Sequence, residues 1–195
     1  DNQYIESMWR ALKKLWDEGL LYKGHKIVPY CPRCGTSLAS HEVAQGYKDV
    51  EEETVYVRFR AKNQENTYFL AWTTTPWTLP SNVALCVNPA LEHVKAKQGD
   101  VYYYLAEGML ETVLGEDYEV VERYTGKELE YLEYEPLFPF ASAEKKAWYV
   151  TCADYVALGE GTGIVHIAPA FGEDDAKVGH NYDLPFVQMV DAKGN

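Results

Sequence analysis

Trp72-Thr73-Thr74-Thr75-Pro76-Trp77-Thr78-Leu79-Pro80-Ser81-Asn82 carries more structural information than any other part of this sequence. An apolar run over residues 68–72 leads into three consecutive threonines, and two prolines then keep the backbone out of regular structure. Pro76 also biases Thr75 towards an extended conformation. We therefore predict a strand whose end presents hydroxyl and N–H groups to a polar ligand and a bound water. The alternative is a threonine-rich strand followed by a simple proline turn.

A second informative stretch is Gly161-Thr162-Gly163-Ile164-Val165-His166-Ile167-Ala168-Pro169-Ala170-Phe171-Gly172-Glu173-Asp174-Asp175. A glycine-rich turn leads into a short apolar strand that ends near His166, and an acidic helix start with Asp175 follows nine residues later. A histidine and a carboxylate in these places can build a compact polar pocket. The alternative is a histidine satisfied within the core and carboxylates that offset the helix dipole.

The remaining pattern predicts many short strands and few helices. Runs typical of strands occupy residues 54–59, 68–72, 83–87, 101–105, 148–152 and 163–167. Short helices are predicted over residues 106–114 and 173–182. Because few helices separate the strands, we predict an α+β fold with a mixed, barrel-like sheet rather than a doubly wound sheet.

The first part of the chain lacks the strand-like runs that follow it, so we place a domain boundary near residue 46, giving domains 1–46 and 47–195. Residues 4–21 have the apolar spacing of an amphipathic helix, whose stripe we expect to pack as a core face. Cys31 and Cys34 have the spacing of two zinc ligands, but a structural zinc needs four. His25 and His41 lie nearby, although we favour half of a zinc site completed outside this chain.

The composition restricts partners and location. The formal net charge is -12, from 30 acidic and 18 basic residues, so any RNA contact is expected to be local or to depend on another domain. No apolar run is long enough to span a bilayer, and four cysteines do not indicate a disulfide framework. We expect a monomer in the reducing cytoplasm, cut from a longer polypeptide because the chain starts at Asp1.

These segments resemble the editing domain, or connective peptide, that is inserted into isoleucyl-tRNA synthetases. Residues 72–82 are similar to that family's threonine-rich peptide, residues 161–175 to its other pocket segment, and residues 29–42 to the base of the insertion. Related valyl and leucyl enzymes continue the threonine peptide with arginine, proline and an acidic residue, whereas Thr75-Pro76-Trp77 stands here. The HIGH and KMSKS motifs of the ATP-dependent synthetic site are absent, so ATP binding would belong to the parent enzyme.

The resemblance implies the fold and the activity of an aminoacyl-tRNA deacylase. The fold would be the barrel-like editing domain of the valyl, isoleucyl and leucyl synthetases, with an N-terminal helix and a small cysteine-knuckle base. The reaction would be hydrolysis of valine from mischarged isoleucine tRNA, without a cofactor for editing. The partner would be the aminoacylated 3′ end of that tRNA, held mainly by the rest of the parent enzyme.

The resemblance also assigns roles to individual residues. Asp175 resembles the carboxylate that pairs with the α-ammonium group of the substrate, and His166 resembles the residue that limits the size of the amino-acid pocket. A wall of three threonines would contact the amino acid and the terminal adenosine, and the Trp72 and Trp77 rings would shape the pocket. The implied catalytic set is Thr73, Thr74, Thr75, Asn82, His166 and Asp175, of which Asn82 would support hydrolysis.

Three other interpretations stay open. A related synthetase domain of other specificity would share the hydrolase chemistry, although Trp77 argues against it. A zinc-knuckle module that binds RNA or protein without catalysis would hold stoichiometric zinc and lack esterase activity. A structural insertion with a decayed pocket is disfavoured because the threonines, His166 and Asp175 would be costly to keep buried without a use.

Overall fold

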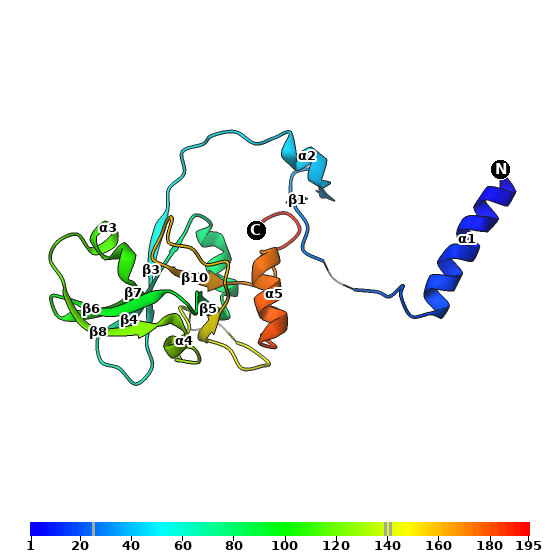
Figure 1. The fold of residues 1–195 in the computed structure, drawn as a ribbon. Helices are drawn as coiled ribbons and strands as arrows, with labels where there is room; N and C mark the ends of the chain where they lie inside the picture. Colours follow the sequence, from blue (N-terminus) through cyan, green and yellow to red (C-terminus); the bar gives the residue numbers. More distant parts are fainter. Residues whose placement is uncertain (25, 139, 141) are drawn as a thin grey trace.

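The computed structural model describes residues 1–24, 26–138, 140 and 142–195, and Figure 1 shows a body of mixed sheets with α5 beside them. The helices are α1 (Asn2–Asp17), α2 (Ser40–Ala44), α3 (Leu110–Leu114), α4 (Gly126–Leu129) and α5 (Glu173–Asn181), with 3-10 helices η1 (Pro76–Ser81) and η2 (Glu107–Met109). The strands are β1 (Tyr30–Cys31), β2 (Thr36–Ser37), β3 (Val55–Arg60), β4 (Thr67–Thr73), β5 (Ala84–Val87), β6 (Glu92–Gln98), β7 (Val101–Ala106), β8 (Glu119–Thr125), β9 (Tyr149–Cys152) and β10 (Ile164–Ile167).

The larger sheet has the strand order β3-β4-β7-β6-β8. Its neighbouring strands are antiparallel except for β4 and β7, which run parallel with Phe69 opposite Tyr104. Because side chains alternate between the faces of a strand, Phe69 enters the main core, where it joins Leu85 and Val150 of the smaller sheet. On the other face, Leu110 of α3 packs against β6 and β7. Both faces of the sheet are therefore covered near its centre.

The smaller sheet places β5 between β10, which is antiparallel to it, and β9, which is parallel. All four residues of β5 are buried, as expected for a central strand with both faces covered. Val178 of α5 packs against Ile167 of β10 in a second apolar cluster. Since β10 also contacts β4, this packing brings the end of the threonine strand, the histidine strand and the acidic helix start into one region.

The predicted strand pattern is largely confirmed. All six expected strands are present within two residues of their predicted ends, and both short helices are found. Strands β6 and β8 were missed because β6 contains one large apolar residue, Val94, and β8 is mostly exposed. The mixed α/β character is confirmed. The barrel-like closure is not, because the described strands form open sheets with β3, β8, β10 and β9 at their edges.

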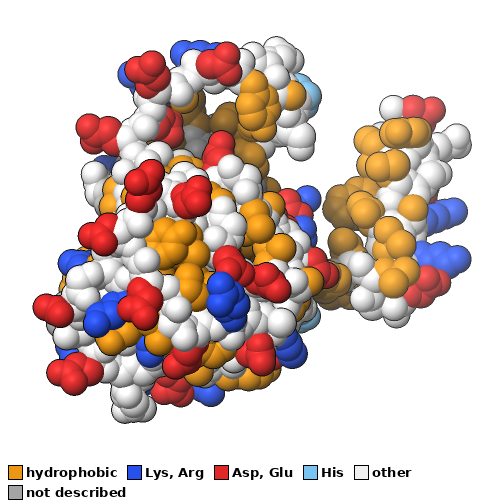
Figure 2. Space-filling view, turned by 60° about the vertical axis from the view of Figure 1, so that its left-hand side comes forward, with side chains coloured by type: hydrophobic (Ala, Val, Ile, Leu, Met, Phe, Trp, Pro, Cys, Tyr) orange, Lys and Arg blue, Asp and Glu red, His pale blue; other side chains and the backbone are white. Residues whose placement is uncertain are grey.

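α1 has no buried residue, so our expectation that its apolar stripe packs as a core face is wrong for the described part of this chain. Trp9 and Trp16 are 67% and 65% exposed, respectively. Figure 2 shows hydrophobic side chains gathered along one side of this helix, and Figure 1 shows the helix standing away from the body. The helix forms through its local pattern and through Asp1, whose carboxylate accepts the N–H of Gln3 at 2.9 Å.

The cysteine pair lies in a tight turn between β1 and β2. Cys34 donates its backbone N–H to Cys31 Sγ at 3.4 Å, which lowers the pKa of the Cys31 thiol. Within the described residues no group of three or more histidine, cysteine or acidic side chains could hold a metal, and His25 lies outside them. The zinc half-site of Cys31 and Cys34 therefore stays a prediction, as does the boundary near residue 46. The described helices are too short or too polar to cross a membrane.

Candidate functional site

The three threonines leave the end of β4, as the sequence predicted. Thr73 is the last residue of the strand and is buried, whereas Thr74 and Thr75 are exposed. Thr73 Oγ1 accepts the backbone N–H of Thr75 at 3.1 Å and lies 3.5 Å from the Thr75 hydroxyl. The turn therefore fixes the hydroxyl groups of Thr73 and Thr75 next to each other.

η1 follows the threonines and takes the place of the irregular proline turn that we predicted. Pro76 begins this short helix, where a missing backbone N–H costs nothing because that group would have no helical partner. Trp77 is 54% exposed, and its ring meets the Phe171 ring edge-on, with 5.3 Å between the centroids. This contact joins the threonine segment to the loop between β10 and α5.

His166 lies on β10 and is 8% exposed. Its Nε2 is 2.9 Å from Oγ1 of Thr78 in η1, and the same hydroxyl donates to the backbone oxygen of Thr75 at 2.9 Å. Burial lowers the pKa of His166 to about 4, so the ring is neutral at pH 7. Thr78 thus connects both segments singled out in the sequence. It was overlooked there, although it follows Thr75 by three residues, the spacing of one 3-10 turn.

Asp175 lies in the first turn of α5 and is partly buried. Its Oδ2 accepts the backbone N–H of Ala168 at 3.0 Å, which fastens the start of the helix to the end of β10. Burial raises the pKa of the Asp175 carboxyl. A Cβ at Gly172 would lie 2.9 Å from Asp175 Cγ, so a larger residue there would displace the Asp175 side chain. The Asp175–Ala168 bond therefore closes the loop between β10 and α5.

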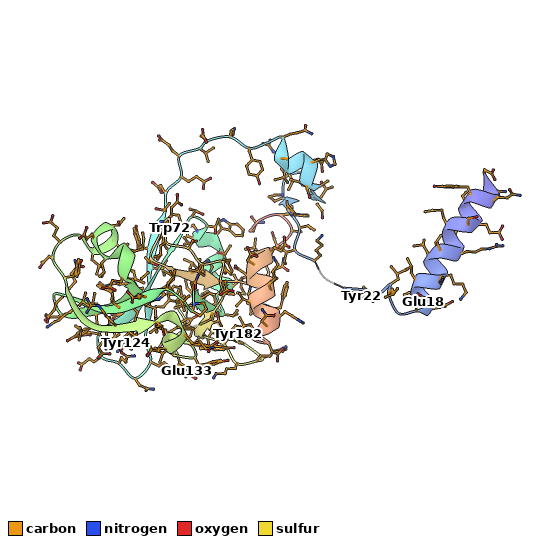
Figure 3. All side chains as sticks on the ribbon, in the orientation of Figure 1. Glu18, Tyr22, Trp72, Tyr124, Glu133 and Tyr182 are labelled. Atoms are coloured by element: carbon orange, nitrogen blue, oxygen red, sulfur yellow. The ribbon has the colours of Figure 1, made fainter. Side chains whose placement is uncertain are left out.

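The glycine turn before β10 lies against Trp72, which Figure 3 labels near the end of β4. Gly163 has a φ of +72°, and a Cβ there would approach Ala106 Cβ to 2.3 Å, so only glycine fits. The buried ring of His93 holds the turn through Nε2, 3.2 Å from the Gly163 oxygen. This role of His93 carried no signal in the sequence, because it depends on contacts between distant strands.

A cavity of about 170 Å³ lies between this turn and the threonine strand. It is lined by Trp72, residues 155–157 and residues 160–165. None of Thr73–Thr75, His166 and Asp175 lines this cavity, but their chain neighbours Trp72 and Val165 do. A hollow next to a tryptophan ring suits a flat aromatic ligand such as a nucleobase.

Asn82 has no hydrogen bond to the threonines, His166 or Asp175 in the described residues. Its side chain is buried, where Oδ1 accepts the hydroxyl of Tyr134 at 2.6 Å and Nδ2 donates to the Ala84 oxygen at 2.8 Å. Its backbone oxygen also accepts the indole N–H of Trp148 at 3.2 Å. These bonds fix the end of η1 against the core, and the structure therefore gives the catalytic role that we predicted for Asn82 no support.

The threonine segment at the end of β4, His166 of β10 and Asp175 of α5 thus lie on elements that contact one another through β10. A sequence model of the tRNA synthetases class I (I, L, M and V) matches residues 1–170. The chain belongs to this family. The match includes the threonine segment and His166, and Asp175 lies just beyond it.

This class I synthetase sequence is similar to curated isoleucine–tRNA ligases over nearly its whole length. It is 60% identical over 193 residues to the enzyme of Clostridium acetobutylicum and 52% identical over 194 residues to that of Bacillus thuringiensis, which is 99% and 100% of this chain, respectively. The relative from Picrophilus torridus is 49% identical over 99% of this chain. In each case the chain spans 19% of the length of the relative.

Solved structures show that this synthetase segment has the fold of leucyl-tRNA synthetase editing domains. The crystal structure of GlLeuRS-CP1 aligns with a TM-score of 0.57 at 16% identity, over 66% of this chain and 60% of that one. The cytosolic leucyl-tRNA synthetase editing domain of P. knowlesi aligns with a TM-score of 0.55 at 16% identity, over 68% and 63%. At these identities the likeness concerns the fold alone.

Proposed function

We propose that this chain is the editing domain of an isoleucine–tRNA ligase and hydrolyses the ester of valine on mischarged isoleucine tRNA. The observation that carries the proposal is the Thr78 hydroxyl, which joins the threonine segment to His166. The start of α5, fastened to the end of β10 through Asp175 and Ala168, adds a carboxylate to the same region. The names of the similar isoleucine–tRNA ligases and the editing-domain fold support it.

The physical need for such a site is a problem of size. Valine lacks one methylene of isoleucine, and a hydrophobic pocket discriminates by only about 1–3 kcal/mol for one methylene, a limit for which this pair of amino acids is the standard example. A second, tighter pocket can admit valine and exclude isoleucine by steric overlap. His166 is suited to set that limit, because the Thr78 hydroxyl and the surrounding core hold its ring in place.

The chemistry proposed is ester hydrolysis by a positioned water. The Asp175 carboxylate would pair with the α-ammonium group and so orient the ester. Hydroxyl and backbone groups of Thr73, Thr74 and Thr75 would hold the water and the developing negative charge. The terminal adenosine would lie in the neighbouring cavity against Trp72, with Trp77 at the rim. This proposal needs no metal or other cofactor for editing.

Partners and metal follow from the same proposal. With a net charge of -12 the chain would bind tRNA weakly by itself, and the rest of the parent enzyme would hold the tRNA body and bind ATP. Cys31 and Cys34 would contribute half of a structural zinc site, with the other ligands supplied from outside this chain. Residues 1–46 would then form the base of the insertion, and residues 47–195 the editing domain.

The test is a deacylation assay of the chain with isoleucine tRNA charged with either radiolabelled valine or isoleucine. We expect the valyl ester to be hydrolysed at least tenfold faster than the isoleucyl ester, since steric exclusion adds to the methylene difference. Equal loss of both esters at the uncatalysed rate would refute the proposal. The same assay with valine tRNA charged with threonine or valine tests for an editing domain of other specificity. Faster loss of the threonyl ester would indicate such a domain, against which Trp77 argues.

A further inference from the structure

Neither ring nitrogen of His166 is open to solvent or to a ligand. Nε2 lies 2.9 Å from the Thr78 hydroxyl. Nδ1 is buried and, among the described residues, has no hydrogen-bond partner. Among the described residues, the hydrogen bond to Thr78 of η1 is therefore the one polar contact that holds the His166 ring.

The direction of that contact decides which nitrogen carries the proton. The Thr78 hydroxyl has one hydrogen to donate, and its oxygen lies 2.9 Å both from the Thr75 backbone oxygen, which can only accept, and from His166 Nε2. With that hydrogen on the carbonyl, the Thr78 oxygen accepts from His166, so the proton of the neutral ring is on Nε2 and Nδ1 carries a lone pair. In the opposite arrangement Nδ1–H would be a buried donor without an acceptor, which is the rarer and costlier defect.

We propose that Thr78 is a positioning residue that holds His166 in the neutral Nε2–H form, so that the imidazole acts as a fixed wall and takes no proton in the reaction. The tautomer stands on the geometry alone. Its consequence for selectivity rests on the proposed editing function, because a wall limits substrate size only if an aminoacyl ester lies against it. The low pKa of His166 agrees with a ring that stays neutral.

The tautomer can be read by nitrogen NMR of the chain labelled with ¹⁵N-histidine. The chain has five histidines, and the signals of His166 are those absent from His166→Gln. At pH 7 we expect Nε2 to have the shift of a protonated nitrogen and Nδ1 that of an unprotonated one. In Thr78→Val, which keeps the shape but loses the hydroxyl, the two shifts should move towards each other as both tautomers become populated. Thr78→Ser should restore the wild-type pattern.

Thr151→Val is the matched control. The Thr151 hydroxyl is also buried and donates to a backbone oxygen, that of Leu85, at 2.8 Å. Its loss should cost comparable stability and leave the His166 signals unchanged. In the deacylation assay, Thr78→Val should raise the ratio of isoleucyl to valyl ester hydrolysis by about tenfold, the effect of losing one hydrogen bond. Thr78→Ser and Thr151→Val should keep the wild-type ratio.

The outcomes separate this inference from the proposed function. A wild-type spectrum with the proton on Nδ1 overturns the inference, even if valyl-tRNA is hydrolysed. So does a Thr78→Val spectrum identical to that of the wild type. A chain that shows the Nε2–H form but leaves valyl-tRNA intact supports the tautomer and refutes the editing function. If Thr78→Val does not fold, as judged by circular dichroism, the wild-type and Thr78→Ser spectra still decide the tautomer.

Discussion

Asp175→Asn should reduce kcat/KM for hydrolysis of valyl-tRNA by about 100-fold, the effect of losing a charge-assisted contact to the substrate. Asparagine has the shape of aspartate, and its side-chain oxygen can still accept the N–H of Ala168. The loop between β10 and α5 should therefore keep its structure while the negative charge disappears. Initial rates of ester loss at several tRNA concentrations measure the effect.

Asp174→Asn is the control for this substitution. Asp174 is the preceding carboxylate of the same helix turn, and it is exposed and paired with Lys177 at 2.9 Å. Its removal should change the rate by less than about threefold, because exposed pairs contribute little. If Asp175→Asn and Asp174→Asn behave alike, Asp175 does not anchor the substrate and the site lies elsewhere.

His166→Ala should remove the size limit and let the chain hydrolyse correctly charged isoleucyl-tRNA. Replacing the buried ring with a methyl group leaves a space larger than the one methylene by which the two substrates differ. We expect the isoleucyl rate to rise to within about tenfold of the valyl rate, since only the small methylene discrimination would remain. The measurement is the ratio of the two initial rates, with unfolding by urea to check that the variant is folded.

His180→Ala is the matched control, since His180 is an exposed histidine near the end of α5. It should keep the wild-type ratio of isoleucyl to valyl hydrolysis. Unaltered selectivity in folded His166→Ala would show that the imidazole is not part of the size limit. The positioning role of Thr78 for selectivity would then fail with it.

The sequence predicted those parts of the fold that depend on local patterns. The apolar run before Thr73 predicted the end of β4, whereas the prolines after it were expected to keep the chain irregular and instead lie in η1. Carboxylates from Glu173 to Asp175 favoured a helix start, and α5 begins at Glu173. β6 was missed because Val94 is its only large apolar residue, although Lys95 and Lys97 alternate with buried positions as in a half-buried strand. Their aliphatic stems lie on partly buried sheet positions, which a simple hydrophobic pattern does not reveal.

The residues of the candidate site came from the resemblance, and their hydrogen bonds to one another could not be predicted. Resemblance supplied His166, Asp175 and the threonines, and the structure brings their segments together. It did not reveal that Thr78 joins two of these segments, because that bond spans residues far apart in the chain. The role of Asn82 in hydrolysis stays a prediction, and the structure shows its amide engaged by Tyr134 and the Ala84 backbone. Side-chain hydrogen bonds across a core depend on packing, which no local pattern encodes.

The exposed apolar face of α1 is another feature that the local sequence pattern could not predict. The spacing that predicts a helix also predicts something to cover its apolar stripe, and in the described residues nothing covers it. The chain spans only 19% of the length of the similar isoleucine–tRNA ligases. The spacing of apolar residues in α1 does not show whether the surface that covers them is part of this chain.

The most direct test of the shared pocket is a crystal structure of the chain with a valyl-adenosine analogue in which an amide replaces the labile ester. The account predicts the ammonium nitrogen at about 3 Å from the Asp175 carboxylate, with the valine side chain against the His166 ring. The Thr73–Thr75 segment should contact the scissile linkage. A valyl group bound elsewhere, with no contact to Asp175 or His166, would contradict it.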